Sequence, residues 1–178
     1  MTAQIPDKVF YQGEQYSLIG VRGGELITPQ QFGMQPQMLH TACYRGFYAT
    51  YEITDDLLYL RELTLREQDD NYLPIAGSEP QKERYQATYH NLSLAVPFNG
   101  ELRLAKDFIQ ELYIHMGYQK ASAFKTVLDI TLEGGHVIAV VDRSKEMEKM
   151  RGAFNKRFKS GEISQGINEA FSLDMDLE

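Results

Sequence analysis

The residues best suited to binding a small polar molecule gather on one expected β-hairpin. Residues 45–53 and 57–66 are rich in Tyr, Phe, Thr and Leu and flank the turn Thr54-Asp55-Asp56, a pattern typical of two paired strands. The pairing creates an aliphatic and aromatic face with three opposed pairs: Ile53 and Leu58, Tyr51 and Leu60, Phe47 and Thr64. The polar side chains fall on the other face: Tyr48, Thr50 and Glu52 against Tyr59, Arg61 and Leu63.

Arg61 is the centre of this polar face, because the pairing makes Glu52 its diagonal neighbour within ion-pairing reach. If the face lines the inside of a barrel, an arginine beside tyrosines, a threonine and a carboxylate can bind a small anionic or amphipathic ligand. If the face is an outer surface, the same residues form an ordinary cross-strand salt bridge. We take Tyr48, Thr50, Glu52, Tyr59 and Arg61 as candidate ligand-binding residues.

Tyr113 and His115 complete the candidate set. The segment 106–117 fits either a strand or a helical turn, and its Tyr and Ile content favours a strand. Glu111, Tyr113 and His115 then share one face, but positions 111 and 115 lie about 13 Å apart along a strand, too far for direct contact. A residue of a neighbouring strand could still partner His115, whose ordinary pKa suits acid–base or binding roles.

The sequence predicts no catalytic residue, metal site or cofactor. The single cysteine, Cys43, lies near His40, so the two could hold a metal ion or form a Cys–His nucleophile, or the thiol could simply be a small buried side chain. The four histidines have no spacing that suggests a metal site. Phosphate-binding glycine loops, the nucleophile elbow, zinc-protease helices and EF-hand loops are all missing.

Alternating apolar residues and turn signals predict four hairpins, which together indicate an antiparallel meander of about eight to ten strands. The hairpins pair residues 9–11 with 15–21, 45–53 with 57–66, 91–96 with 101–105, and 124–132 with 137–142. The alternation also predicts a buried set: Phe47, Tyr51, Ile53, Leu58, Leu60, Leu128, Ile130, Val137, Ala139 and Val141.

The expected fold is all-β or β-rich α+β, with the meander closed into a full or partial barrel and C-terminal helices packed against it. A two-sheet sandwich or roll is the alternative. A meander followed by a helix resembles the layout of the lipocalins, and this resemblance implies a ligand-binding barrel. The Gly-x-Trp motif that opens lipocalins is missing, since the chain contains no tryptophan.

We expect one domain over residues 1–178. The meander covers residues 9–143 with a polar insertion at 67–90, a helical segment covers 144–171, and residues 172–178 form a frayed tail. Ser144 is the expected N-cap of a helix over 145–159 that Gly161 ends, and a second short helix is expected over 164–171. One apolar stripe should dock the first helix on the sheet: Met147, Met150, Phe154 and Phe158.

Composition narrows the function. The chain has 178 residues, 43% of them hydrophobic, and a net charge of −7, which disfavours nucleic acid and anionic membranes as partners. With no apolar run long enough to span a bilayer and no signal-like start, we expect a cytoplasmic protein. The sequence favours a non-catalytic module that binds a small ligand. A protein-interaction module of the inhibitor or immunity type is the first alternative, and an enzyme without local signatures is the second.

Overall fold

The computed structural model describes residues 2–157, 173 and 175 of the chain. These residues form ten strands: β1 (Lys8–Tyr11), β2 (Glu14–Arg22), β3 (Phe47–Thr54), β4 (Leu57–Leu65), β5 (Gln81–Lys82), β6 (Ala87–Tyr89), β7 (Leu94–Ala95), β8 (Gly100–Phe108), β9 (Phe124–Glu133) and β10 (His136–Asp142). The helical segments are η1 (Pro29–Phe32), η2 (Gln110–Leu112), η3 (Ala121–Ala123) and α1 (Ser144–Arg157). The expectation of a β-rich fold is confirmed.

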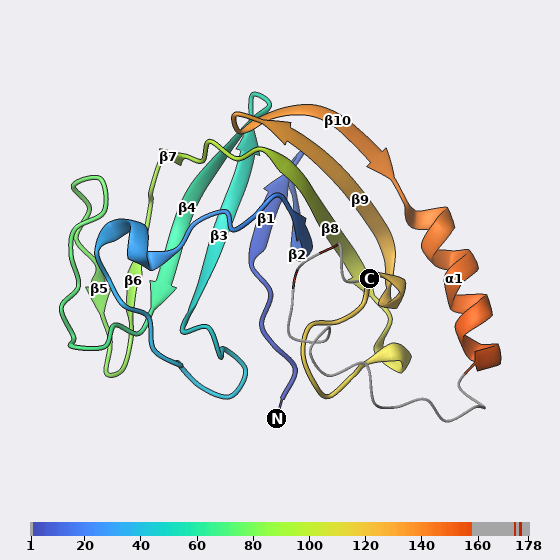
Figure 1. The fold of residues 1–178 in the computed structure, drawn as a ribbon, viewed down its shortest axis with the longest axis horizontal. Helices are drawn as coiled ribbons and strands as arrows, with labels where there is room; N and C mark the ends of the chain where they lie inside the picture. The colour runs from blue at the N-terminus through green and yellow to red at the C-terminus, as the bar shows by residue number, and fades with distance from the viewer. Residues whose placement is uncertain (1, 158–172, 174, 176–178) are drawn as a thin grey trace.

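Seven of the strands form a ring-like sheet (Figure 1). Their order is β10-β9-β8-β2-β1-β3-β4, and a pairing of β10 with β4 returns to the start of the series. β6 and β7 pair with β4, and β5 pairs with β6, so these short strands extend the sheet beside the ring. The sheet is not a pure antiparallel meander, because β1 and β3 run parallel.

The ring is closed by contact between two turns. The only residues that pair between β10 and β4 are His136 and Leu57. Gly135 donates its N–H to the carbonyl of Phe98 at 2.8 Å, and its carbonyl accepts the N–H of Leu58 at 2.9 Å. Gly135 has a φ of +86°, and a Cβ there would lie 2.3 Å from the carbonyl oxygen of Val96. This close approach therefore requires glycine.

Three of the four expected hairpins are confirmed as β1–β2, β3–β4 and β9–β10. The fourth, between residues 91–96 and 101–105, is wrong: β7 pairs with β4, whereas β8 pairs with β2 and β9. The Asn-Gly signal serves a different purpose, because Asn99 accepts the N–H of Gly134 through its side chain and Phe98 is buried in the core. The turn links neighbouring loops and does not fold β8 back on β7.

The expected strand over 106–117 is also wrong beyond its first residues. β8 ends at Phe108, and the chain continues into η2. Asp107 has a φ of +61°, outside the strand region, and its carboxylate accepts the hydroxyl of Thr126 at 2.9 Å. Asp107 lies one residue before the end of β8, and the strand propensity of the Tyr and Ile residues that follow does not extend the strand.

The inside of the ring holds the main core. Six expected core residues are buried: Phe47, Tyr51, Ile53, Leu58, Leu60 and Ile130. Leu128 and Val137 are partly buried against the same cluster. Ala139 and Val141 are exposed, contrary to expectation. Beyond His136 only β9 pairs with β10, and a register shift between Val137 and Ala139 interrupts the alternation.

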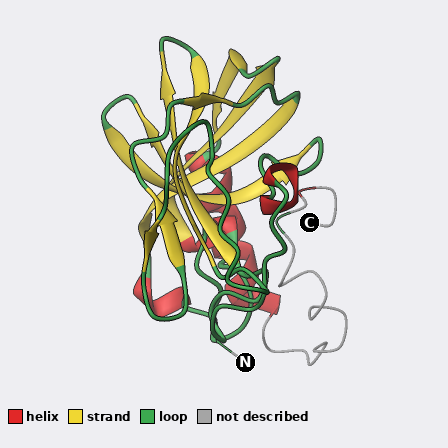
Figure 2. Cartoon of the chain, turned by 90° about the vertical axis from the view of Figure 1, so that its left-hand side faces the viewer, coloured by secondary structure: helices red, strands yellow, loops and turns green. Residues whose placement is uncertain are grey.

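The helix α1 packs on the outside of the sheet, as expected, but not through the whole expected stripe. Met147 is buried in a second cluster that includes Phe124 and Val127 of β9, whereas Met150 is 52% exposed. The side chains of Phe154 and Phe158, and the second helix expected over 164–171, lie outside the described residues. In Figure 2 most of the helical segments lie in the lower part of the view, toward the N-terminus. No helix within the described residues has the length and hydrophobicity to cross a membrane.

Candidate functional site

A cavity of about 550 Å³ lies where the start of the chain meets β2 and β3, a volume in the usual range for small-molecule sites. The residues that line it come from distant parts of the sequence: Gln4, Asp7, Leu18, Val21, Gly23, Gly24, Glu25, Leu26, Ile27, Tyr44, Arg45, Phe47, Tyr51, Tyr118 and Leu173. The wall combines aliphatic and aromatic side chains with a few polar ones.

Gln4 holds three chain segments together beside the cavity. Its side-chain nitrogen donates to the carbonyl of Thr41 at 3.0 Å, and its side-chain oxygen accepts the N–H of Tyr44 at 3.0 Å. Its own N–H donates to the carbonyl of Gly117 at 2.8 Å. This buried glutamine therefore fixes the loops that carry Tyr44 and Tyr118 against the first residues of the chain.

An ion pair between Asp7 and Arg45 forms the polar part of the wall. Asp7 is 3% exposed, and it accepts the guanidinium of Arg45 and the N–H of Ala49, the latter at 2.7 Å. Burial raises the pKa of Asp7, against the lowering effect of Arg45. Burial alone would lower the pKa of Arg45, but the Asp7 carboxylate outweighs it and raises that pKa. Arg45 therefore remains charged.

Arg45 is held by more than this ion pair. Its Nε donates to the carbonyl of Phe47 at 2.9 Å, and its guanidinium lies 4.5 Å from the centre of the Phe47 ring. Nη2 is the nitrogen that meets Asp7, and among the described residues Nη1 has no acceptor. The guanidinium is planar, so these contacts also fix the direction of Nη1.

Tyr51 and Tyr118 add phenol groups to the wall. Burial raises the pKa of Tyr51 well above its ordinary value, and the nearby Asp7 carboxylate adds to this rise. Burial also raises the pKa of Tyr118, although Arg45 acts in the opposite direction. Both phenols therefore keep their protons and can donate hydrogen bonds at neutral pH.

The charges of the lining residues do not favour a free anion. Among the described lining residues, Asp7 balances the one guanidinium, that of Arg45, and Glu25 adds a second carboxylate. The aliphatic part of the wall comes mainly from β2 and the loop that follows it: Leu18, Val21, Leu26 and Ile27. The arrangement therefore suits a molecule with an apolar body and an uncharged polar group.

The site expected from the sequence lies elsewhere, on the other face of β3 and β4. The side chains of Tyr48, Thr50, Glu52, Tyr59 and Arg61 are each half-buried and alternate with the core residues of the same strands. The expected ion pair is present, with 2.6 Å between Nε of Arg61 and Oε2 of Glu52. Arg61 also donates to Ser93 at 2.6 Å and lies over the ring of Tyr59.

A bulge in β4 changes the expected pairing beyond this ion pair. Tyr51 faces Leu60 and Thr50 faces Glu62, so Arg61 has no opposite residue. Phe47 therefore faces Leu65 and not Thr64, and Leu63 points into the core and not onto the polar face. One extra residue in β4 turns each side chain that follows it in the strand to the opposite face of the sheet.

Tyr113 and His115 do not join the other expected site residues. Both are exposed in the segment after η2, and their rings lie 5.0 Å apart. No hydrogen bond, ion pair or ring contact of the described residues links them to Arg61 or its neighbours. Once β8 ends at Phe108, the two side chains have no strand face to share.

His40 and Cys43 do not form a nucleophile. The Cys43 thiol donates to the carbonyl of Phe47 at 3.3 Å, and burial raises its pKa, which is unfavourable for a reactive thiolate. Nδ1 of His40 accepts the N–H of Ala42 at 3.2 Å. Among the described residues, no group of three or more His, Cys, Asp or Glu side chains is placed to hold a metal ion.

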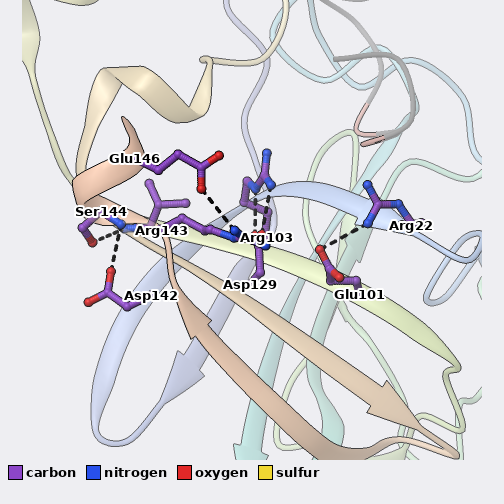
Figure 3. Close-up of polar contacts among 9 residues, drawn as sticks. Arg22, Glu101, Arg103, Asp129, Asp142, Arg143, Ser144 and Glu146 are labelled. Atoms are coloured by element: carbon purple, nitrogen blue, oxygen red, sulfur yellow. Dashed lines mark hydrogen bonds and ion pairs between the residues drawn. The ribbon is translucent and has the colours of Figure 1, made fainter. Parts of the chain in front are cut away.

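A second polar cluster, on the outer face of β8 and β9, is closed by its own contacts (Figure 3). Asp129 is 3% exposed and accepts two hydrogen bonds from Arg103, at 2.8 and 3.0 Å. Arg143 donates to Asp129 at 3.1 Å and to Glu146 at 3.1 Å, which ties the start of α1 to the sheet. Because these charges are paired with one another, we assign the cluster a structural role.

The sequence analysis did not find Asp7, Arg45 or Tyr118 as site residues. They lie at strand ends and in loops, far apart along the chain, and no spacing connects them. Tyr51 was expected in the core, and its hydroxyl was the available signal, because a buried tyrosine needs a partner for its O–H.

Comparisons with known proteins assign no family to the chain. No protein-family model, curated protein or solved structure matches it. The function is therefore inferred from the geometry of the site.

Proposed function

We propose that the protein binds a small amphipathic molecule in the cavity beside Asp7 and Arg45. The observation that carries this proposal is a cavity of about 550 Å³ whose wall combines apolar side chains with polar ones, among them the buried ion pair of Asp7 and Arg45. The ring-like sheet supports it as a barrel-like scaffold of the kind that holds ligands in lipocalins. The proposed function is of the class expected from the sequence, a module that binds a small ligand, but the proposed site lies on the inner side of β3 and not on its outer face.

The ligand is amphipathic and not a simple anion. Asp7 already forms an ion pair with Arg45, and Glu25 would repel a negative group of a ligand. Apolar side chains of β2 and the following loop supply the larger part of the attraction, since burial of apolar surface is the main favourable contribution in such sites. A cytoplasmic location remains a prediction.

Binding of Nile red, an uncharged apolar dye, tests the proposal. Val21→Phe places a larger side chain in the cavity wall without touching the ion pair, and we expect it to weaken binding about tenfold, or about 1.4 kcal/mol. Val141→Phe makes the same change on the exposed part of β10 and should leave the affinity unchanged. Fluorescence titration gives both affinities, and melting temperatures check that each variant folds.

Arg61→Met provides a second control, because it removes the arginine favoured by the sequence. We expect Arg61→Met to bind the dye as the parent chain does. Absence of saturable binding by the parent chain, or equal affinities for the two phenylalanine variants, would contradict the proposal. A loss of dye binding in Arg61→Met would indicate that the binding site lies on the outer face of β3 and β4.

A protein-interaction module remains the second candidate, and one observation favours it. β10 exposes three apolar side chains, those of Ile138, Val140 and Val141. Most of the length of β10 pairs with β9 alone. An exposed apolar edge strand is a surface on which another strand can pair. An enzyme without local signatures has no comparable support, since His40 and Cys43 hold different partners.

A further inference from the structure

We propose that the ligand of this cavity carries an uncharged carbonyl group, which accepts hydrogen bonds from the Tyr51 hydroxyl and from Nη1 of Arg45. This inference rests on the proposed function and names the chemical class of the molecule that the same site binds. It depends on two donors that have no partner among the described residues.

Tyr51 supplies the first donor. Its side chain is 1% exposed and lines the cavity. No described residue forms a hydrogen bond with its hydroxyl, yet among the described residues no fully enclosed side-chain oxygen or nitrogen lacks a partner. The hydroxyl must therefore reach the space of the cavity. Leaving a donor without an acceptor in an apolar site is unfavourable, so an acceptor on the ligand adds affinity here.

Arg45 supplies the second donor. The carbonyl of Phe47 occupies Nε, and Asp7 occupies Nη2, so Nη1 is the part of the guanidinium that remains for a ligand. Tyr51, Asp7 and Arg45 all line this cavity, which places the three groups in one neighbourhood. Two donors that line the same cavity define where the polar group of the ligand lies.

A carbonyl oxygen fits these donors better than the other common polar groups. It has two lone pairs in one plane and no hydrogen of its own, so it can accept both hydrogen bonds. A carboxylate would accept them too, but it would add a negative charge beside Asp7 and Glu25. A hydrocarbon would leave both donors unpaired. The cavity therefore selects a ketone, ester or amide on an apolar body.

Three naphthalenes of nearly equal shape test this selection: 2-acetylnaphthalene, 2-ethylnaphthalene and 2-naphthoate. Each displaces Nile red from the full chain, and the displacement curve gives its affinity. We expect the ketone to bind about tenfold more tightly than the hydrocarbon and more tightly than the carboxylate. Tyr51→Phe should weaken ketone binding about tenfold and leave hydrocarbon binding within about twofold.

Tyr59→Phe is the matched control, because it removes the same hydroxyl from the outer face of β4 and should change neither affinity. Equal binding of ketone and hydrocarbon by the parent chain would overturn the inference, and this comparison needs no variant. Tighter binding of 2-naphthoate would overturn the uncharged group. In both cases dye binding leaves the proposed function intact, whereas failure of Nile red and all three naphthalenes to bind rejects both.

Discussion

Two buried aspartates show how differently one residue type is used in this protein. Asp129 lies on β9 beside the start of α1 and accepts hydrogen bonds from two arginines, so its charge is paired within the cluster. Asp7 meets one arginine and one backbone N–H, and both Asp7 and that arginine line the cavity. Complete pairing is typical of a structural ion pair, whereas a donor left over beside a cavity is typical of a binding site.

Glu67 is expected to make stability depend on pH. This buried carboxylate accepts the N–H groups of Asp69 at 2.7 Å, Asn71 at 2.9 Å and Gln35 at 3.3 Å. Burial alone would raise the pKa of Glu67, but these donors outweigh it and lower that pKa. A lowered pKa in the folded chain stabilises it above the pKa of the unfolded chain, and the effect is lost as the pH falls through the folded value.

We therefore expect Glu67→Gln to cost about 1–3 kcal/mol at pH 7 and to cost less at pH 3, which lies closer to the lowered pKa at which the parent carboxylate takes up a proton. Urea unfolding at the two pH values measures the difference. Glu133→Gln is the control, because Glu133 is exposed at the end of β9 and should show a small effect at both. A cost for Glu67→Gln that is the same at pH 3 and pH 7 would show that its charge contributes nothing.

At the scale of elements, the ring depends on two neighbouring glycines that have different surroundings. Gly134 and Gly135 both have positive φ, +58° and +86°, so both avoid the strain that a side chain would bring. A Cβ on Gly134 would meet nothing within 4 Å, whereas one on Gly135 would lie 2.3 Å from the Val96 carbonyl. Only Gly135 lies where the β9–β10 turn meets the end of β4.

Gly135→Ala is expected to lower the free energy of unfolding by about 1–3 kcal/mol more than Gly134→Ala, because the added methyl forces the two turns apart. The two variants share the cost of a left-handed backbone, so their difference isolates the close approach of Gly135 to the Val96 carbonyl. Denaturant unfolding measures it. Equal destabilisation by the two changes would mean that the Val96 carbonyl can move away from the added methyl at little cost.

At the scale of the whole molecule, β10 is the part of the ring that another chain can reach. No charge and no proline interrupt residues 137–141, and Ile138 is 60% exposed. Charged residues and prolines are the usual means by which edge strands avoid pairing with other chains. In a solution of the purified chain, the partner available to this edge is a second copy of the same strand.

Weak self-association that Ile138→Lys abolishes is the expected consequence. A lysine on β10 adds a charge that opposes strand pairing, and it should leave the melting temperature close to that of the parent. Ile114→Lys changes an exposed isoleucine outside the strands and should leave association unaltered. Sedimentation velocity over a range of concentrations compares the three chains. A parent chain that stays monomeric throughout would show that the bulge in β10 already prevents pairing.

The sequence alone determined the local part of this structure. Alternation and turn residues predicted the β1–β2, β3–β4 and β9–β10 hairpins and placed Ile53 opposite Leu58 and Glu52 beside Arg61. The sequence placed the start of α1 within one residue, although Ser144 is its first residue and not its N-cap, since the Ser144 hydroxyl accepts the N–H of Val127. Each of these features depends on residues close together in the chain, because short-range hydrogen bonds and side-chain periodicity are enough to specify them.

Only the tertiary structure decided which face of a strand is the inside and what meets there. Closure of the ring placed Arg61 outside and Tyr51 inside, and a bulge that no local signal marked brought Leu63 into the core. The cavity joins Asp7, Arg45 and Tyr118, which come from separate segments. Their convergence depends on long-range pairing and burial, and such contacts leave no periodic pattern in the residues on either side of them.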